Sequence, residues 1–158
     1  MESSLHDVMH SFHYGLFLEK ALMLATYYHK GQVDISGQPY IMHLLSVASR
    51  VETVRQKTIA VLHDILEDTD IPEHILSVYF RSDIVDGVVA LTRRGGVYYD
   101  DYIDGIMNHY DPDVVLIKIA DLRHNCDPIR LGILKDHDVT RMNKYMKALG
   151  KLEQTLRD

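Results

Sequence analysis

The stretch His63-Asp64-Ile65-Leu66-Glu67-Asp68 decides the fold of this chain, because it closes a segment, residues 58–67, that is apolar almost all round. A helix that is apolar on every side belongs in the interior of a domain, so we predict that residues 58–67 form the buried central helix. At 3.6 residues per turn, Glu67 lies one turn beyond His63 and Asp68 one turn beyond Asp64. Four titratable side chains therefore share one edge of the predicted central helix.

This cluster of titratable groups favours a metal site. Charged groups on a buried helix destabilise the folded state unless they are paired or hold a metal ion. An imidazole nitrogen beside a carboxylate oxygen suits a borderline divalent ion. The two further carboxylates could orient a water molecule on that ion and move its proton. The alternative is a core histidine, satisfied by hydrogen bonds, beside a solvated acidic helix end.

The rest of the chain shows helical periodicity and no sustained alternation of the kind that marks strands. No linker rich in Gly, Ser or Pro interrupts it, so we predict one all-α helical bundle, a single domain over residues 1–158. The expected helices are one ending near Gly31, then 41–54, 58–67, Pro72 to Phe80, 82–91 with Ser82 as its cap, 99–108, 113–125 after the start signal Asp111-Pro112, and 139–156.

Composition limits the class of protein. Hydrophobic residues make up 46% and charged residues 25% of the 158 residues, which is ordinary globular usage. Seventeen basic against 23 acidic residues give a net charge of −6, which argues against nucleic acid as a partner. No apolar run approaches the length of a membrane span. Cys126 is the only cysteine, which excludes a disulfide framework and favours the cytoplasm. A homo-oligomer stays open.

Two neighbouring segments supply further ligand-type residues. Tyr40-Ile41-Met42-His43 opens the predicted second helix, and Asp121 lies inside a strongly apolar helix with Asn125 one turn beyond it on the same face. Ten histidines are present, but His6, His10 and His13 recur at helical spacing with no carboxylate in register. For those three we predict a polar helix face and no metal site.

Four segments of the chain carry a recognisable pattern, and they occur in this order: HKGQ at 29–32, SGQPYIMH at 36–43, LHDILEDT at 62–69 and KIADLRHN at 118–125. Together they resemble the HD-domain hydrolases of the RelA/SpoT group and the metazoan small alarmone hydrolases. The resemblance implies an all-α HD domain that binds one divalent metal ion, typically Mn²⁺. It also implies that the protein removes the 3′-pyrophosphate from guanosine tetra- and pentaphosphate, so that its partner is a small nucleotide.

The resemblance assigns roles position by position. It implies that the metal ligands are His43, His63, Asp64 and Asp121, and that Glu67 and Asp68 position and deprotonate the attacking water. Two imidazoles and two carboxylates leave coordination positions open for water and substrate, as catalytic metal sites do. The resemblance also places Asn125, Arg141 and Tyr145 against the substrate.

Each of the other candidate residues allows two interpretations of its role. Lys118, one turn before Asp121, reaches the pyrophosphate or neutralises the cluster. Arg93 with Arg94 clamps phosphate or forms a solvated basic loop. His29 and Gln32 brace the ligand-bearing helix from behind, or His29 merely caps a helix end.

One departure from the family bears on specificity. Asp34 stands where the alarmone hydrolases carry a basic residue that flanks the guanine. A carboxylate cannot stack on a purine as a guanidinium does and repels phosphate, so we expect weaker binding of guanosine tetraphosphate. The alternatives are therefore an HD phosphatase or pyrophosphohydrolase on another nucleotide or dinucleotide, or a catalytically degenerate nucleotide-binding regulatory domain.

Overall fold

A computed structural model describes residues 17–130 and 132–157, and the predicted face of His6, His10 and His13 lies outside them. The described residues are helical, with one isolated bridge between Val33 and Pro39, so the all-α prediction is confirmed. The helices are α2 Phe17–Tyr28, α3 Ile41–Ala48, α4 Val54–Leu62, α5 Ile65–Asp68, α6 Glu73–Tyr79, α7 Ser82–Leu91, α8 Tyr99–Met107, α9 Pro112–Asn125, the 3₁₀ turn η1 Pro128–Arg130, and α10 Asp136–Thr155.

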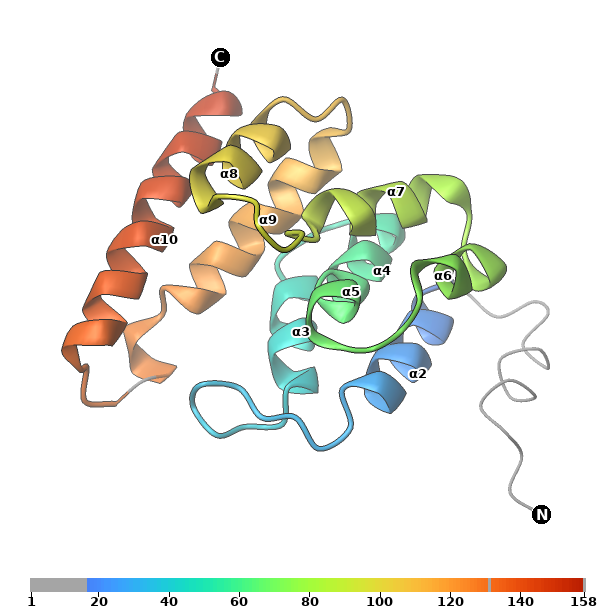
Figure 1. Cartoon of the computed structure of the whole chain (residues 1–158), viewed down its shortest axis with the longest axis horizontal. Helices are drawn as coiled ribbons and strands as arrows, with labels where there is room; N and C mark the ends of the chain where they lie inside the picture. The colour runs from blue at the N-terminus through green and yellow to red at the C-terminus, as the bar shows by residue number, and fades with distance from the viewer. Residues whose placement is uncertain (1–16, 131, 158) are drawn as a thin grey trace.

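Helix α4 is the centre of the molecule, as predicted from its apolar character. It packs against α2, α3, α7 and α9 (Figure 1), and its residues from Thr58 to Leu62 are all buried. Helix α7 comes so close that a Cβ atom on Gly87 would lie 2.8 Å from Cδ1 of Ile59. Glycine at position 87 therefore permits the close contact between α7 and α4.

The predicted helix over 41–54 is wrong at its C-terminal end. Helix α3 ends at Ala48 and Val54 begins α4. The cause is a capping box: the Thr53 side chain accepts a hydrogen bond from the Gln56 backbone, and Gln56 Oε1 accepts one from the Thr53 N–H at 3.0 Å. This pair of bonds starts a new helix, although the apolar pattern continues across the junction.

The predicted continuous helix over 58–67 is also interrupted. Helix α4 ends at Leu62 and α5 begins at Ile65, so His63 and Asp64 form the corner between two helices. The Asp64 carbonyl begins α5, because it accepts hydrogen bonds from the Asp68 N–H at 2.9 Å and the Glu67 N–H at 3.2 Å. Asp64 has left the regular helix, with φ −100° and ψ −2°.

Two predicted caps had different outcomes. Asp111 caps α9 as expected, because its side chain accepts a hydrogen bond from the Asp113 N–H at 3.0 Å and Pro112 follows as the first helical residue. Ser82 is itself the first residue of α7, and Arg81 holds the cap position with no side-chain hydrogen bond.

Helices α8, α9 and α10 build the second half of the molecule. Helix α10 packs along α9 and also contacts α8, and Figure 1 shows α9 and α10 side by side on the left. One continuous cluster of buried apolar residues runs from Ala21 in α2 to Leu152 in α10. None of the helices in the described residues is both long and apolar enough to cross a membrane.

Candidate active site

Four side chains from three parts of the chain meet where α3, α9 and the α4–α5 corner approach one another. Ligand-type atoms of His43, His63 and Asp64 all lie within 4.8 Å of one another. Oδ1 of Asp121 lies 3.3 Å from Nε2 of His43 and 3.5 Å from Nε2 of His63. The same two nitrogens lie 3.4 Å and 3.0 Å from Oδ2 of Asp64. The structure thus brings together all four residues predicted to hold a metal.

The orientation of His63 fits a metal ligand. Its Nδ1 lies 2.7 Å from the Ala60 carbonyl oxygen, which can only accept, so in the neutral imidazole Nδ1 carries the hydrogen and Nε2 presents a lone pair. Nε2 is buried and has no hydrogen-bond partner among the described residues. A lone pair and two carboxylates that converge on one point repel one another unless a cation lies between them. A divalent cation fits this arrangement of donors.

The second imidazole is held from behind by another histidine. Nδ1 of His43 lies 2.7 Å from Nδ1 of His124. Burial, followed by the positive charge of Arg130, lowers the pKa of His124 to about 4, so this ring is neutral at pH 7. When His43 donates the shared hydrogen, its Nε2 turns a lone pair toward the carboxylates. Sequence reasoning gave His124 no role, although it stands in the quoted KIADLRHN segment.

Protonation of the cluster competes with metal binding. Burial opposes a positive charge on His63, but the carboxylates of Asp64 and Asp121 raise its pKa well above the ordinary value for histidine. The site therefore attracts positive charge, which a proton or a metal ion can supply. Because a ligating imidazole must be unprotonated, metal affinity should fall as the pH falls.

Asp121 is oriented by two neighbours on its own helix. Lys118 Nζ lies 2.8 Å from Oδ2, and the Asn125 side-chain amide donates to Oδ1 at 2.7 Å. Lys118 is largely buried, with 12% of its side chain exposed, and its ammonium also lies 5.2 Å from the ring centroid of Tyr102. Of the two readings of Lys118, the structure shows the neutralising contact, and the residue also lines the pocket described below.

Glu67 and Asp68 lie beside the cluster. Glu67 Oε2 accepts a hydrogen bond from the Arg93 backbone N–H at 2.8 Å. The Tyr40 hydroxyl lies 2.6 Å from Oδ2 of Asp64 and 3.0 Å from Oδ2 of Asp68, and so links the cluster to α5. Burial and the nearby charge of Asp64 raise the pKa of both Glu67 and Asp68. Raised values suit carboxylates that exchange protons near neutral pH.

His29 and Gln32 contact residues that lie beside the cluster. Nδ1 of His29 lies 2.8 Å from Oε1 of Gln32, whose amide donates to the Asp68 carbonyl at 2.8 Å. The His29 ring also stacks on Tyr40 with centroids 4.9 Å apart. Together these contacts tie the end of α2 to the two residues that face Asp64.

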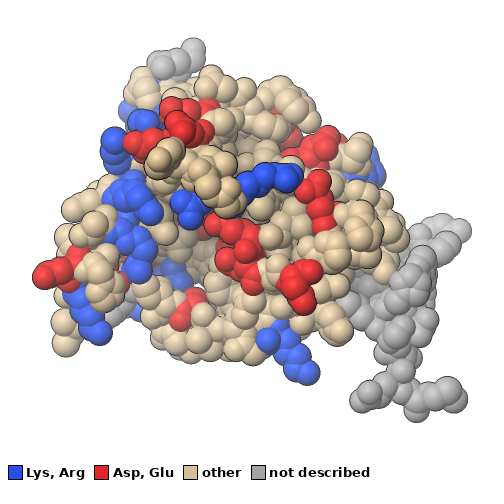
Figure 2. Space-filling view, in the orientation of Figure 1, with Lys and Arg blue, Asp and Glu red and all other residues tan. Residues whose placement is uncertain are grey.

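The cluster forms the floor of a pocket of about 360 Å³. Figure 2 shows acidic side chains gathered over α5 at the centre of this face, with basic side chains beside them. The predicted substrate residues that line the pocket are Arg93, Lys118, Asn125, Arg141 and Tyr145. The next residue, Arg94, is not among the residues that line this pocket, and its side chain pairs with Glu73 on the surface. Residues that sequence reasoning missed also line the pocket, among them Tyr40, Tyr99, Tyr102, Arg130 and Lys144.

Asp34 lies at the pocket, as predicted, but it is paired. Arg130 donates to its Oδ2 at 2.5 Å, and Ser36 and Gln38 donate to its Oδ1. Burial alone would raise the pKa of Asp34, but these hydrogen bonds lower it to about 2. The expectation of a carboxylate free to repel phosphate is therefore wrong, because the Arg130 guanidinium of η1 pairs with Asp34.

Comparison with known proteins gives relatives named as guanosine-3′,5′-bis(diphosphate) 3′-pyrophosphohydrolases and others named as GTP pyrophosphokinases. No family model matches the chain. The chain is 37% identical over 116 residues to a guanosine-3′,5′-bis(diphosphate) 3′-pyrophosphohydrolase of Haemophilus influenzae, and the matched region covers 65% of this chain and 17% of that protein. It is 32% identical over 120 residues to a protein of the same name from Borreliella burgdorferi, with coverages of 67% and 18%. The chain thus spans under a fifth of the length of these relatives.

A solved structure shares the fold. The protein is described as a metazoan ortholog of SpoT that hydrolyzes ppGpp; the TM-score is 0.72 at 22% identity, and the match covers 89% of this chain and 85% of that one. These findings confirm the resemblance drawn from the four sequence segments. The chain is an HD-domain protein similar to the RelA/SpoT hydrolases.

Proposed function

We propose that this chain is a metal-dependent nucleotide phosphohydrolase that removes the 3′-pyrophosphate of guanosine 3′,5′-bis(diphosphate). The observation that carries the proposal is the convergence of two imidazoles and two carboxylates on one point at the floor of a pocket. The names of the relatives from Haemophilus influenzae and Borreliella burgdorferi support the choice of substrate.

The proposed metal ligands are His43, His63, Asp64 and Asp121, and the proposed ion is Mn²⁺, as in the family that the chain resembles. When bound, a divalent ion polarises a phosphoryl oxygen and lowers the pKa of a coordinated water. The chain's contribution is to hold its four donors in place. His124 and Ala60 orient the two rings, and Lys118 with Asn125 orients the carboxylate on α9.

Glu67 and Asp68 are the proposed proton-handling pair. Their carboxyl groups line the pocket beside the cluster, on the helix that follows the ligand pair His63-Asp64. The Arg93 N–H fixes one oxygen of Glu67 and leaves the other available to accept a proton from the attacking water. Tyr40 fixes Asp68 in the same way, and burial with the two carboxylates raises the pKa of Tyr40, so its phenol stays a donor.

The basic and aromatic residues of the pocket are the proposed substrate contacts. Lys118 and Arg93 line the pocket together with the proton-handling pair and can neutralise phosphate oxygens. Arg141 and Tyr145 on α10, together with Asn125 on α9, also line the pocket and are proposed to contact the nucleoside.

A second candidate is hydrolysis of another nucleotide or a dinucleotide on the same cluster. The pairing of Asp34 with Arg130 favours it, because the guanidinium at this edge comes from η1, not from the loop that carries it in the alarmone hydrolases. A degenerate regulatory domain is the third candidate. The presence of both Glu67 and Asp68 beside four ligand-type residues disfavours it, because a pure binder has no use for a proton-handling pair.

The proposed setting is the cytoplasm, with a small nucleotide as the only partner and no role for nucleic acid. The lone cysteine and the net charge of −6 support this setting. Self-association stays a prediction.

The test is a panel of nucleotides incubated with the full chain and manganese, with pyrophosphate and phosphate resolved as products. We expect pyrophosphate release from guanosine tetraphosphate, and no release by the Glu67→Gln variant under the same conditions. Release of phosphate alone from other nucleotides would favour the second candidate. Nucleotide binding with no product from any member of the panel would favour the regulatory domain.

A further inference from the structure

One wall of the pocket carries a hydroxyl group with no partner. Tyr99 is the first residue of α8 and lines the pocket, and its Oη is buried with no hydrogen-bond partner among the described residues. The neighbouring Tyr102 differs, because its hydroxyl donates to the Leu91 carbonyl. A buried polar group left unpaired destabilises a protein by about 1–3 kcal/mol. Such a group beside a pocket is explained when a ligand supplies the missing partner.

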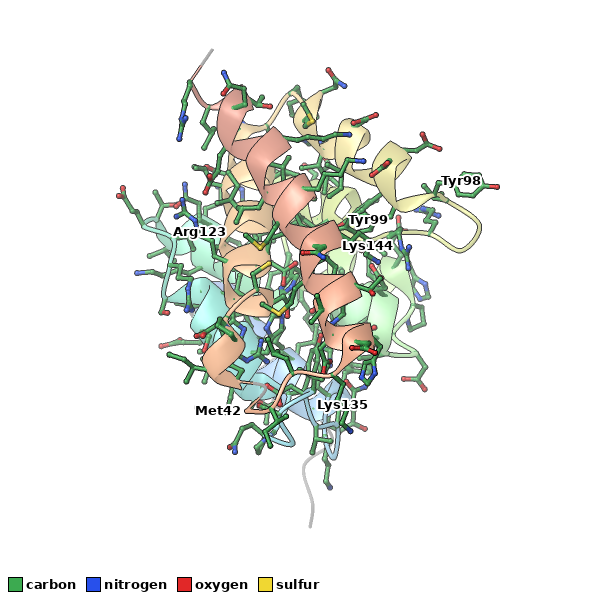
Figure 3. The ribbon with its side chains drawn as sticks, turned by 90° about the vertical axis from the view of Figure 1, so that its left-hand side faces the viewer. Met42, Tyr98, Tyr99, Arg123, Lys135 and Lys144 are labelled. Carbon is green, nitrogen blue, oxygen red and sulfur yellow. The ribbon has the colours of Figure 1, made fainter. Side chains whose placement is uncertain are left out.

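A cation without a carboxylate partner stands over the same ring. Nζ of Lys144 on α10 lies 4.5 Å from the ring centroid of Tyr99 and 5.3 Å from that of Tyr145. Figure 3 shows the labelled Tyr99 and Lys144 side chains close together, where α10 passes α8. Among the described residues, no ion pair forms at Lys144, whereas three other cations of this pocket are each paired with a carboxylate: Lys118 with Asp121, Arg130 with Asp34, and Arg141 with Asp138.

The two groups lie next to the candidate metal cluster. The Tyr99 and Tyr102 rings have centroids 6.1 Å apart, and the Lys118 ammonium, which contacts Asp121, lies 5.2 Å from the centroid of Tyr102. Burial raises the pKa of Tyr99, so the phenol is a neutral hydrogen-bond donor at pH 7. A hydroxyl donor on a ring that has an ammonium over its face suits an anion of the size of phosphate.

We infer that the Tyr99 hydroxyl and the Lys144 ammonium form an anion subsite that binds the second phosphate of a pyrophosphate group whose first phosphate lies at the cluster. This inference rests on the proposed function and deepens it. The subsite would make the pocket select diphosphate groups over monophosphates, because only a diphosphate reaches both positions. Its residues lie on α8 and α10, whereas the proposed metal ligands lie on α3, the α4–α5 corner and α9.

The test is a calorimetric titration of the manganese-loaded full chain with inorganic pyrophosphate and, separately, with inorganic phosphate. In Tyr99→Phe we expect the affinity for pyrophosphate to fall about 10-fold, since a hydrogen bond to a charged group is lost. We expect Lys144→Met to give a loss of similar size, and the affinity for phosphate to change less than about twofold in both variants. The controls are Tyr98→Phe, whose side chain is 80% exposed, and Lys147→Met, on the same helix as Lys144.

The melting temperature separates a binding role from a structural one. Removal of an unpaired hydroxyl breaks no hydrogen bond, so Tyr99→Phe should melt at the wild-type temperature or above it. A lower melting temperature with unchanged pyrophosphate affinity would overturn the inference. Weakened pyrophosphate binding in a chain that hydrolyses no nucleotide would support the subsite and refute the proposed reaction. Hydrolysis of guanosine tetraphosphate with unchanged KM in both variants would support the proposed reaction and refute the subsite.

Discussion

The two ends of α4 each gather acidic side chains, but only at the N-terminal end does one cation contact all of them. At the N-terminal end, the Arg55 guanidinium donates to Asp83 at 2.9 Å, to Asp111 at 2.6 Å and to Asp113. At the C-terminal end, Asp64 and Asp121 face two imidazoles, and the ammonium of Lys118 contacts only Asp121.

This difference separates a structural ion network from a candidate reaction site. Every donor nitrogen of Arg55 has an acceptor, and the three carboxylates hold the pKa of its guanidinium above the ordinary value against the effect of burial. At the other end, Nε2 of His63 is buried with no hydrogen-bond partner among the described residues. An arrangement that leaves acceptors facing one another is retained for a ligand that completes it.

The largest effect should come from a substitution in the cluster at the C-terminal end of α4. Asp121→Ala should abolish both bound metal and hydrolysis, because it removes a donor that lies within 3.5 Å of both imidazoles. His63→Ala and Asp64→Ala should do the same. Metal content per chain after gel filtration and the rate of nucleotide hydrolysis are the measurements. Stoichiometric metal in Asp121→Ala would show that α9 contributes no ligand.

The next effect separates proton handling from metal binding at the same end. Glu67→Gln should keep the metal and lower turnover by roughly 100-fold or more, the scale expected for loss of a general acid–base group. The amide keeps the size of the side chain and can still accept from the Arg93 N–H, but it cannot take a proton. Metal content and kcat are measured on the same preparation. If Glu67→Gln lost its metal, Glu67 would be a ligand.

The N-terminal end should respond in stability alone. Arg55→Met removes the guanidinium that three carboxylates share and leaves Asp111 and Asp113 without it, while Asp83 keeps Arg81. The free energy of unfolding should fall by roughly 2–3 kcal/mol, below the full cost for a buried network because the Arg55 side chain is 29% exposed. Urea unfolding gives this value, and manganese titration should give the wild-type affinity. A large loss of metal affinity would mean that the two ends of α4 are coupled, and the comparison would fail.

The fold was predictable wherever a local signal decides it. Asp111-Pro112 starts α9 because a side-chain acceptor and a missing N–H both suit the first turn. The apolar character of 58–62 placed α4 in the core. The sequence pattern did not indicate the breaks at 49–53 and at His63-Asp64, because the apolar positions on either side keep helical spacing across both junctions. The capping box of Thr53 and Gln56 is the local signal for the first break.

The site was predictable in part. The family resemblance identified all four ligand-type residues, because its four segments occur in the same order in this chain. Spacing alone indicated only the pair His63-Asp64 and its acidic neighbours. Arg130 and Lys144 carry no such signal, because their partners come from distant parts of the chain: Arg130 meets Asp34 across 96 residues. The partners of Arg55 lie 28 to 58 residues away for the same reason.

The smallest effect concerns the Arg130–Asp34 pair, which is built like the Arg55 network but lies at the edge of the pocket. The pKa of Asp34 is about 2 in the folded chain, against an ordinary value of 3.8. Because the folded value is the lower one, the ionised carboxylate stabilises the fold above about pH 4, and this contribution disappears as the pH falls toward 2. Asp34→Asn should therefore lower the free energy of unfolding by roughly 1–2 kcal/mol at pH 7.

The difference between wild type and Asp34→Asn should shrink steadily from pH 5 to pH 3 when urea unfolding is repeated across that range. Asp70→Asn, at an exposed position, is the control and should show no such trend. A difference that stays constant with pH would mean that the Asn variant loses packing and not charge. If instead the two proteins were equally stable at pH 7, the Arg130 contact would add nothing to the fold, and its guanidinium would be as available to the pocket as that of Arg93.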